Sequence, residues 1–253
     1  MIVNLIPLAG EGSRYKNQGF KIPKPLIEIN GIPMIVRAAN ALPKADLYIF
    51  ICRKSHLEES NLKSVLNNNF QNLKIIEIDY LTEGQAITCQ LAEQFIPENA
   101  ILNVGACDND MIYNLADYNN IFLNNQEIDA TIWTFTNNPT VEINPKMYGW
   151  VKVENSIAKG VSCKSPISET PINDQAIVGA FSFKNAKIFF DSIRLMIKDN
   201  IRINNEFYVD VALDVAIKNG VKVNTLQIDN YVCWGTPQDY RIFNLWFQYF
   251  QKF

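Results

Sequence analysis

The first residues suited to chemistry form a glycine turn that carries an arginine, Gly10-Glu11-Gly12-Ser13-Arg14, followed by Pro23-Lys24-Pro25. Glycines let backbone N–H groups approach phosphate oxygens, and two cations neutralise the remaining charge. The flanking prolines restrict the backbone around the lysine, so its ammonium group is held at a lower entropic cost. No Walker A sequence follows, and Tyr15 stands where a dinucleotide fingerprint requires its third glycine. The segment therefore predicts a different phosphate-binding loop, suited to a nucleoside triphosphate.

Alternating apolar patterns predict the elements that position this loop. Strands are expected at 2–7, 47–52, 73–80, 100–104, 128–136, 148–154, 157–163, 175–184 and 221–228. Helices are expected at 33–42, 55–68, 85–95, 114–125, 185–199, from about 204 to 218, and from 237 onward. Because strands and helices alternate, the fold class is α/β: a Rossmann-like (GT-A-like), mostly parallel sheet flanked by helices. We expect one domain over residues 1–253, with a small β-rich lobe at about 140–185.

Two further segments with unusual chemistry follow expected strands. Thr82-Glu83-Gly84-Gln85-Ala86 comes after the third strand, and Gly105-Ala106-Cys107-Asp108-Asn109-Asp110 ends the fourth. In open α/β sheets, ligands bind at the carboxyl ends of the strands. We therefore expect both segments and the first loop to share one site.

The residues of these segments suit a nucleotide base and a metal ion. Gly84 would let a planar base approach, and the Gln85 amide offers a donor and an acceptor to a base edge. An ordinary helix start capped by Thr82 is the alternative. Asp108 can hold Mg²⁺, which needs oxygen ligands and retains waters and substrate phosphates. Asp110 either joins this metal site or caps a helix start.

The opening run Leu8-Ala9-Gly10-Glu11-Gly12-Ser13-Arg14, with Pro23-Lys24-Pro25-Leu26 and Gly31-Ile32-Pro33-Met34, resembles the signature of the sugar-phosphate nucleotidyltransferases. Their pattern is G-x-G-T-R … P-K-P-L … G-x-P-M, and the likeness continues to Gly235-Thr236-Pro237. It implies that Arg14 and Lys24 bind the triphosphate and act in catalysis with Asp108. The residues implied to contact the nucleotide are Leu8, Ala9, Gly10, Glu11, Gly12, Ser13, Arg14, Lys24, Glu83, Gly84, Gln85 and Ala106.

The same resemblance implies an acceptor site in the lobe. Two segments of this chain resemble the acceptor-binding strands of the family: Tyr148-Gly149-Trp150-Val151 and Val161-Ser162-Cys163-Lys164. Cys163 replaces the family's acid, while Lys164 keeps the cation that would bind the acceptor phosphate; a solvated surface lysine is the alternative. Glu206 would either face the acceptor or serve only as a first-turn acid that the helix dipole favours.

The expected metal site departs from the family pattern. The family often supplies a second metal ligand just before a late Gly-Thr, but Cys233-Trp234-Gly235-Thr236 holds no carboxylate there. Either Asp108 suffices as the protein ligand of the metal ion, with Asp110 near it, or a second oxygen ligand comes from Glu206 or Asp210.

The reaction that the resemblance implies is nucleotidyl transfer. A phosphate oxygen of the acceptor attacks the α-phosphorus in line and pyrophosphate leaves, with positioning and electrostatics providing the catalysis. Within the family, the chain is most similar to compact capsule-biosynthesis cytidylyltransferases. This implies CTP, Mg²⁺ and a small phosphorylated acceptor such as phosphoglutamine or a sugar 1-phosphate, for bacterial capsule or surface polysaccharide precursors.

Other functions stay open at this point. A UTP- or dTTP-dependent sugar-1-phosphate nucleotidyltransferase would carry the same motifs. A GT-A glycosyltransferase would use Asp108-Asn109-Asp110 as its D-x-D metal motif, but it has no reason to carry Arg14 and Pro23-Lys24-Pro25. A non-catalytic protein of the same fold would be expected to lose Arg14, Lys24 or Asp108.

Composition narrows the choice of partners and compartment. The formal net charge of −3 and the scattered aromatic residues disfavour nucleic-acid binding. Apolar runs fall far short of the ~20 residues of a membrane span. Five cysteines without a CxxC pair favour a reducing cytoplasm. His56, the only histidine, makes a Ser–His triad improbable. The aromatic tail 243–250 is expected either to pack on its own chain or to form a homo-oligomer.

Overall fold

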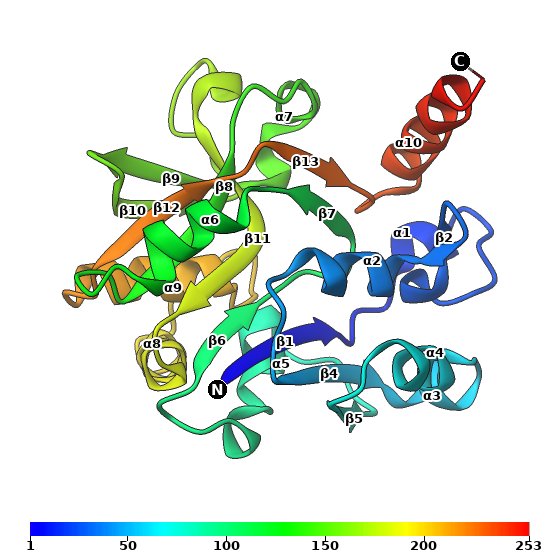
Figure 1. The fold of residues 1–253 in the computed structure, drawn as a ribbon, viewed down its shortest axis with the longest axis horizontal. Helices are drawn as coiled ribbons and strands as arrows, with labels where there is room; N and C mark the ends of the chain where they lie inside the picture. Colours follow the sequence, from blue (N-terminus) through cyan, green and yellow to red (C-terminus); the bar gives the residue numbers. More distant parts are fainter. Residues whose placement is uncertain (253) are drawn as a thin grey trace.

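A nine-stranded mixed sheet forms the centre of the computed structural model, which describes residues 1–252 (Figure 1). Across the sheet, the strands are β5 (Leu73–Ile78), β4 (Leu47–Arg53), β1 (Ile2–Leu8), β6 (Ile101–Val104), β11 (Gln175–Phe183), β8 (Ala130–Phe135), β12 (Val223–Gln227), β10 (Ile157–Cys163) and β9 (Gly149–Glu154). The first four strands are parallel to one another, and β12 is parallel to β8. Strand β11 runs antiparallel to both β6 and β8, and β9 and β10 form an antiparallel hairpin. The predicted α/β class is confirmed.

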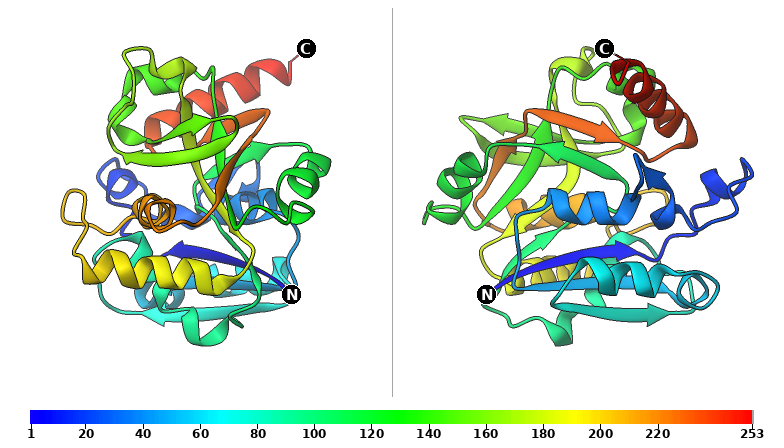
Figure 2. Two further views of the ribbon diagram at one scale, coloured as in Figure 1. Left: turned by 90° about the vertical axis from the view of Figure 1, so that its left-hand side faces the viewer. Right: turned by 45° about the vertical axis from the view of Figure 1, so that its right-hand side comes forward.

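Helices cover both faces of this sheet (Figure 2). Strand side chains alternate between faces, so Val3 and Leu5 of β1 lie in one core and Ile6 and Leu8 in the other. The first core includes α5 (Gln85–Gln90), α8 (Ala186–Lys198) and α9 (Val209–Lys218). The second includes α2 (Met34–Ala41), α4 (Leu62–Asn69) and α6 (Leu115–Tyr118).

Two of the expected helices begin or continue differently. The helix expected at 55–68 is divided into α3 (Lys54–Glu58) and α4, because the Ser60 hydroxyl bonds to the His56 carbonyl and the Leu62 N–H. The helix expected from 204 begins only at Val209. Asn204 and Asn205 have φ of 50° and 65°, which places them in the left-handed region of a turn and not in a right-handed helix.

Several short elements around the sheet were not predicted. They include α1 (Ser13–Lys16), the β2–β3 hairpin (Glu28–Ile29 and Ile32–Pro33), the antiparallel pair β7 (Asn109–Ile112) and β13 (Asn230–Cys233), and α7 (Thr140–Ile143). The β7–β13 pair brings the segment after β13 beside Asp108, and the Trp234 N–H donates to the Asp108 carbonyl at 2.8 Å.

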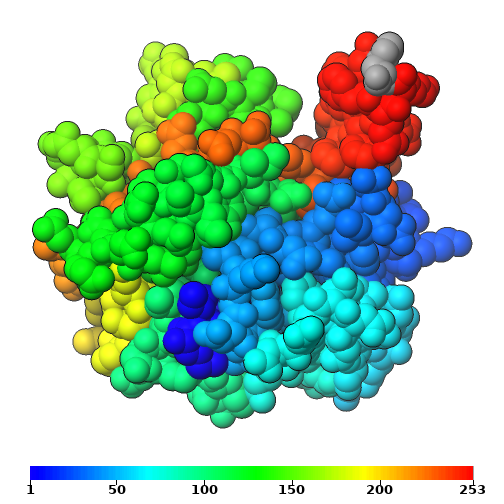
Figure 3. Space-filling model, in the orientation of Figure 1, coloured from blue at the N-terminus to red at the C-terminus, as the bar shows by residue number. Residues whose placement is uncertain are grey.

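The last helix, α10 (Pro237–Phe250), projects from the rest of the chain (Figures 1 and 3). A capping box fixes its start: the Thr236 hydroxyl accepts from the Asp239 N–H, and the Asp239 carboxylate accepts from the Thr236 N–H. None of the helices within residues 1–252 combines the length and hydrophobicity of a bilayer crossing. Strands β9, β10 and β11 of the predicted lobe belong to the central sheet; the single domain and the role of the lobe stay predictions.

Candidate functional site

Two adjoining cavities lie at the carboxyl ends of β1 and β6. The first, of about 340 Å³, follows the turn after β1 and is called here the loop cavity; its lining includes Leu8, Ala9, Gly10, Gly12, Lys24, Gly84, Gln85 and Glu206. The second, of about 260 Å³, is called the lobe cavity and is lined by residues that include Arg14, Gln85, Ala106, Asp108, Tyr148, Gly149, Lys164 and Asp210. Gln85 lines both, so the two cavities are neighbours. The structure thus gathers most of the predicted site residues in one region.

Lys24 and Asp108 form an ion pair at this junction. The Lys24 ammonium also donates to the Gly235 carbonyl at 3.3 Å and lies 5.6 Å from the centre of the Tyr15 ring. Burial alone would lower the pKa of Lys24, but the Asp108 carboxylate outweighs it and holds that pKa above its ordinary value. Burial would likewise raise the pKa of Asp108, but Lys24 and Arg14 hold it below its ordinary value. Both groups are therefore charged at neutral pH.

The loop that carries Lys24 is anchored to the segment after β13. Gly12 has φ of 62°, and a Cβ there would lie 3.1 Å from the Lys24 Cβ, so only glycine suits this position. Buried Tyr15 in α1 donates its hydroxyl to the carbonyls of Trp234 and Thr236, at 2.6 and 2.9 Å. The loop and the β13–α10 segment consequently hold Lys24 from two sides.

Arg14 is exposed and lines the lobe cavity. Within residues 1–252 it makes no hydrogen bond or ion pair, although its charge lowers the pKa of Asp108. Glu11 and Ser13, which the resemblance assigns to the nucleotide, line another cavity beside Arg53 and His56, which adjoins the loop cavity because Gly12 and Lys24 line both. Their contacts with a nucleotide stay predictions.

Gly84 has a structural role that the sequence did not indicate. Its φ is 121°, and a Cβ there would lie 2.5 Å from the carbonyl oxygen and 2.6 Å from the nitrogen of Phe207. The Phe207 N–H donates to the Glu83 carbonyl at 2.8 Å, and the Ala86 N–H donates to the Phe207 carbonyl at 3.0 Å. The Glu83 side chain pairs with Arg202. The glycine therefore admits the Phe207 backbone, and its contact with a base stays a prediction.

Thr82 does not cap α5 as the alternative reading expected. Its hydroxyl donates to the Gly84 carbonyl at 3.1 Å and bonds to the Thr88 hydroxyl at 2.6 Å. A cap would instead require this oxygen to accept a hydrogen bond from a backbone N–H of the first helical turn.

Lys164 and Asp210 supply opposite charges to the lobe cavity. Lys164 is half-buried, donates to the Met147 carbonyl at 2.7 Å and lies 5.5 Å from the centre of the Tyr208 ring, so it is not a solvated surface lysine. Asp210 lies in the first turn of α9 and is hydrogen-bonded to the Cys163 thiol. Burial raises the pKa of Asp210, against the opposing effects of Cys163 and Lys164.

Two predicted carboxylates lie elsewhere. Glu206 lines the loop cavity and not the lobe cavity, and it is hydrogen-bonded to Tyr208. Asp110 lines a third cavity, where it lies 3.7 Å from Arg37 and accepts from the Met111 N–H at 2.9 Å. Asp110 thus turns away from Asp108, and the two do not form a D-x-D pair.

The donor set at Asp108 suits a metal ion that arrives with a substrate. Among the described residues, no three His, Cys, Asp or Glu side chains gather into a metal site. Mg²⁺ commonly takes one or two protein carboxylates and completes its coordination with waters and phosphates. The charged Asp108, with Asp210 in the same cavity, fits such a role; the presence of the ion stays a prediction.

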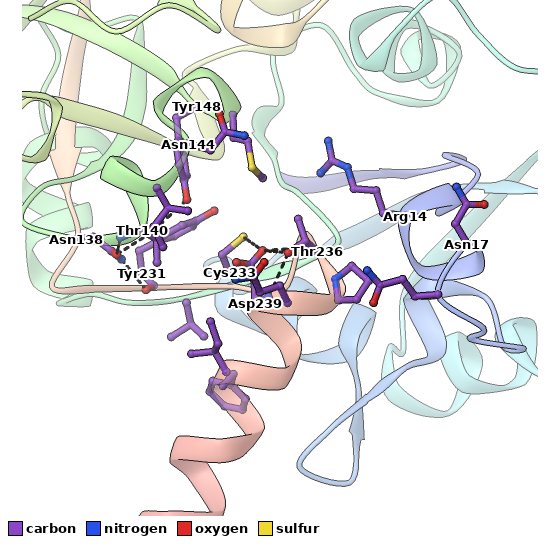
Figure 4. Close-up of a pocket in the computed structure, with 18 residues that line it drawn as sticks. Arg14, Asn17, Asn138, Thr140, Asn144, Tyr148, Tyr231, Cys233, Thr236 and Asp239 are labelled. Atoms are coloured by element: carbon purple, nitrogen blue, oxygen red, sulfur yellow. Dashed lines mark hydrogen bonds between the residues drawn. The ribbon is translucent and has the colours of Figure 1, made fainter. Parts of the chain in front are cut away.

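A larger cavity of about 730 Å³ opens between α7 and α10 (Figures 3 and 4). Arg14 faces it from one side, with Tyr148, Tyr231 and Cys233 across from it (Figure 4). Tyr231 stacks on Phe135 with ring centres 4.2 Å apart. Sequence reasoning missed Tyr231, because only the pairing of β13 with distant β7 brings it here.

Comparison with known proteins supports the fold. No family model matches the sequence, and no curated protein matches it either. Among solved structures, the nucleoside-diphosphate-sugar pyrophosphorylase from Vibrio cholerae RC9 aligns with a TM-score of 0.77 at 19% identity, over 95% of this chain and 98% of its own. The inositol-1-phosphate CTP transferase from T. maritima aligns with a TM-score of 0.75 at 13% identity, over 96% and 95%. A UDP-glucose pyrophosphorylase from Acinetobacter baumanii gives 0.73 at 16% identity, over 98% and 93%.

Proposed function

We propose that this protein is a nucleotidyltransferase of the sugar-phosphate type, which couples a nucleoside triphosphate to a small phosphorylated acceptor and releases pyrophosphate. The observation that carries the proposal is the charged Lys24–Asp108 pair at the junction of two cavities, with Arg14 beside it. The neighbours in fold support it, because they include nucleotide-sugar pyrophosphorylases and a CTP transferase.

In this reaction an acceptor phosphate oxygen forms a bond to the α-phosphorus while the bond to the bridging oxygen of pyrophosphate breaks. Arg14 and Lys24 would neutralise the triphosphate, and Lys164 would hold the acceptor phosphate. Because a phosphate nucleophile is already ionised at neutral pH, no general base is needed, and alignment of two polyanions is the main task. Mg²⁺ on Asp108 would supply further neutralisation of phosphate charge.

CTP is the favoured nucleotide, and the chain would act in the cytoplasm on precursors of bacterial capsule or surface polysaccharide. This choice rests on the resemblance to capsule-biosynthesis cytidylyltransferases, with phosphoglutamine or a sugar 1-phosphate as acceptor. A UTP- or dTTP-dependent sugar-1-phosphate nucleotidyltransferase is the second candidate, since a UDP-glucose pyrophosphorylase aligns about as well as the CTP transferase.

Pyrophosphate release tests the proposal directly. CTP, UTP, dTTP, ATP and GTP are each incubated with Mg²⁺ and a panel of phosphorylated acceptors, including phosphoglutamine and glucose 1-phosphate. We expect acceptor-dependent release that is fastest with CTP. Faster release with UTP or dTTP would favour the second candidate. Release from no combination would contradict nucleotidyl transfer; a glycosyltransferase is already disfavoured, because Asp110 faces Arg37 and not Asp108.

A further inference from the structure

We propose that Asp210 selects the acceptor, by accepting a hydrogen bond from a hydroxyl or ammonium group that the acceptor carries in addition to its phosphate. The proposal rests on the proposed function and narrows its substrate class to phosphates with a hydrogen-bond donor. The sequence pointed to Glu206 for the acceptor, but Glu206 lies in the loop cavity. The lobe cavity that contains Lys164 is lined by two carboxylates, Asp108 and Asp210, and Asp108 is already paired with Lys24.

Strand β9 leaves room for this carboxylate. A Cβ at Gly149 would collide with Oδ2 of Asp210. The backbone of Gly149 is not in the left-handed region, so the conformation of the strand does not require glycine there. Glycine within a strand commonly marks a close approach by another group. Here that group is the Asp210 side chain, which reaches the lobe cavity past the start of β9.

Asp210 keeps unused capacity to accept hydrogen bonds. Its Oδ1 accepts from the Val211 N–H at 3.0 Å, and the carboxylate also accepts from its own backbone N–H and from the Cys163 thiol, which is a weak donor. An ionised carboxylate has about four acceptor positions. The nearby Lys164 ammonium donates to the Met147 carbonyl. A donor from the ligand would therefore satisfy a half-buried carboxylate that the protein leaves incompletely paired.

The charges of the cavity also orient the acceptor. A phosphate would be repelled by the Asp108 and Asp210 carboxylates and attracted to the Lys164 and Arg14 cations of the same cavity, so it would lie nearer to these cations. The donor group would then face Asp210. An acceptor with only a phosphate and an apolar body would leave the carboxylate desolvated and unpaired, which is costly.

Binding of three small phosphates tests this assignment. Isothermal titration calorimetry compares glucose 1-phosphate, which carries hydroxyl donors, 2-aminoethyl phosphate, which carries an ammonium, and ethyl phosphate, which carries no such donor. The proteins are the wild type, Asp210→Asn, Gly149→Ala and Asp214→Asn. Asp214 is the matched control, because it lies one turn later in α9 and bonds to the Val161 N–H at 2.9 Å and to Lys218 at 2.6 Å, outside the cavity lining. Thermal unfolding checks that each variant is folded.

We expect the wild type and Asp214→Asn to bind at least one donor-bearing phosphate about tenfold more tightly than ethyl phosphate, because a hydrogen bond to a charged group is worth about that factor. Asp210→Asn should lose this preference and bind ethyl phosphate at least as tightly as the wild type, because the carboxylate that repels a phosphate is removed. Gly149→Ala should also lose the preference, because its Cβ would displace the Asp210 carboxylate. The better of the two donor-bearing probes identifies the donor as hydroxyl or ammonium.

Absence of a preference in the wild type, including no binding of any probe, overturns the assignment, as does a preference that survives in Asp210→Asn. A Mg²⁺-binding role for Asp210 would instead alter the Mg²⁺ requirement and leave the preference intact, which also overturns it. If the preference depends on Asp210 but no nucleotide yields pyrophosphate, the proposed function fails, while Asp210 still selects donor-bearing phosphates at this cavity.

Discussion

At the scale of single residues, Lys24 and Asp108 carry the most weight, because their side chains are only 15% and 29% exposed and each compensates the charge of the other. We expect Lys24→Ala and Asp108→Ala each to lower kcat/KM for pyrophosphate release by at least about 100-fold, the cost of removing one preorganised charge from a reaction centre. Steady-state assays with saturating Mg²⁺ measure this effect.

Lys21→Ala provides the control for that prediction. Lys21 is an exposed lysine of the same loop that lines neither the loop cavity nor the lobe cavity, so its removal should leave kcat/KM within about twofold. Near-normal turnover in a folded Lys24→Ala or Asp108→Ala protein would contradict the proposed role of the pair.

Because of the same ion pair, we expect the free energy of unfolding to fall as the pH is lowered into the acid range. The folded-state pKa of Asp108 lies below its ordinary value of 3.8, so its contribution is present above pH 3.8 and is lost as the pH falls further through the folded-state value. The pKa of Lys24 lies above 10.5, so that group loses its contribution only in strong alkali. Urea unfolding at pH 5 and pH 3 should show a larger loss of unfolding free energy in the wild type than in Asp108→Asn. Equal losses would contradict the prediction.

At the scale of elements, the buried strands were predictable from the sequence. The strands expected at 47–52 and 157–163 differ by at most one residue from β4 and β10. The continuous apolar run of β4 reflects burial within the sheet, which a local pattern records, whereas β10 is only partly buried and includes exposed Lys159. The β7–β13 pair was not predictable, because its residues lie about 120 positions apart and neither short strand has a pattern of its own. The helix start expected at 204 was wrong because Asn204 and Asn205 form a left-handed turn.

Gly84 allows a direct test of how the start of α5 is held. Gly84→Ala should lower the unfolding free energy by more than about 2 kcal/mol, because it combines an unfavourable φ with a collision against the Phe207 backbone. Gly19→Ala is the matched control, since Gly19 also has positive φ, at 84°, but a Cβ there would meet nothing within 4 Å. Chemical denaturation compares the two variants, and equal losses would show that the contact with Phe207 adds nothing.

At the scale of the whole molecule, the sequence predicted the residues that come together but not how they are held. Arg14, Lys24, Asp108 and Lys164 were all found by local motifs, and the fold places them around two adjoining cavities. The contribution of Asp210 to the lobe cavity depends on the packing of α9 against β9 and β10, which no local pattern reveals. The roles of these five residues in binding and catalysis stay predictions until their variants are assayed.

The exposed face of α10 leads to a prediction about assembly. Among residues 237–250, Pro237 alone is buried, while Leu245 and Trp246 are 65% and 53% exposed. Exposed apolar surface of this kind commonly marks an interface, and burying it in a second copy would remove it from water. We therefore expect the wild type to sediment as a homo-oligomer.

Sedimentation velocity with charged variants tests the interface. Leu245→Glu and Trp246→Glu should each shift the protein toward the monomer, because a carboxylate buried in an apolar contact without a partner costs several kcal/mol. Gln248→Glu is the matched control, since it adds the same charge at an exposed polar position of the same helix. A monomeric wild type would contradict the prediction, and an oligomer that withstands both substitutions would place the interface elsewhere. Because α10 borders the cavity that Arg14 faces, pyrophosphate release should also be assayed in each variant that loses the oligomer.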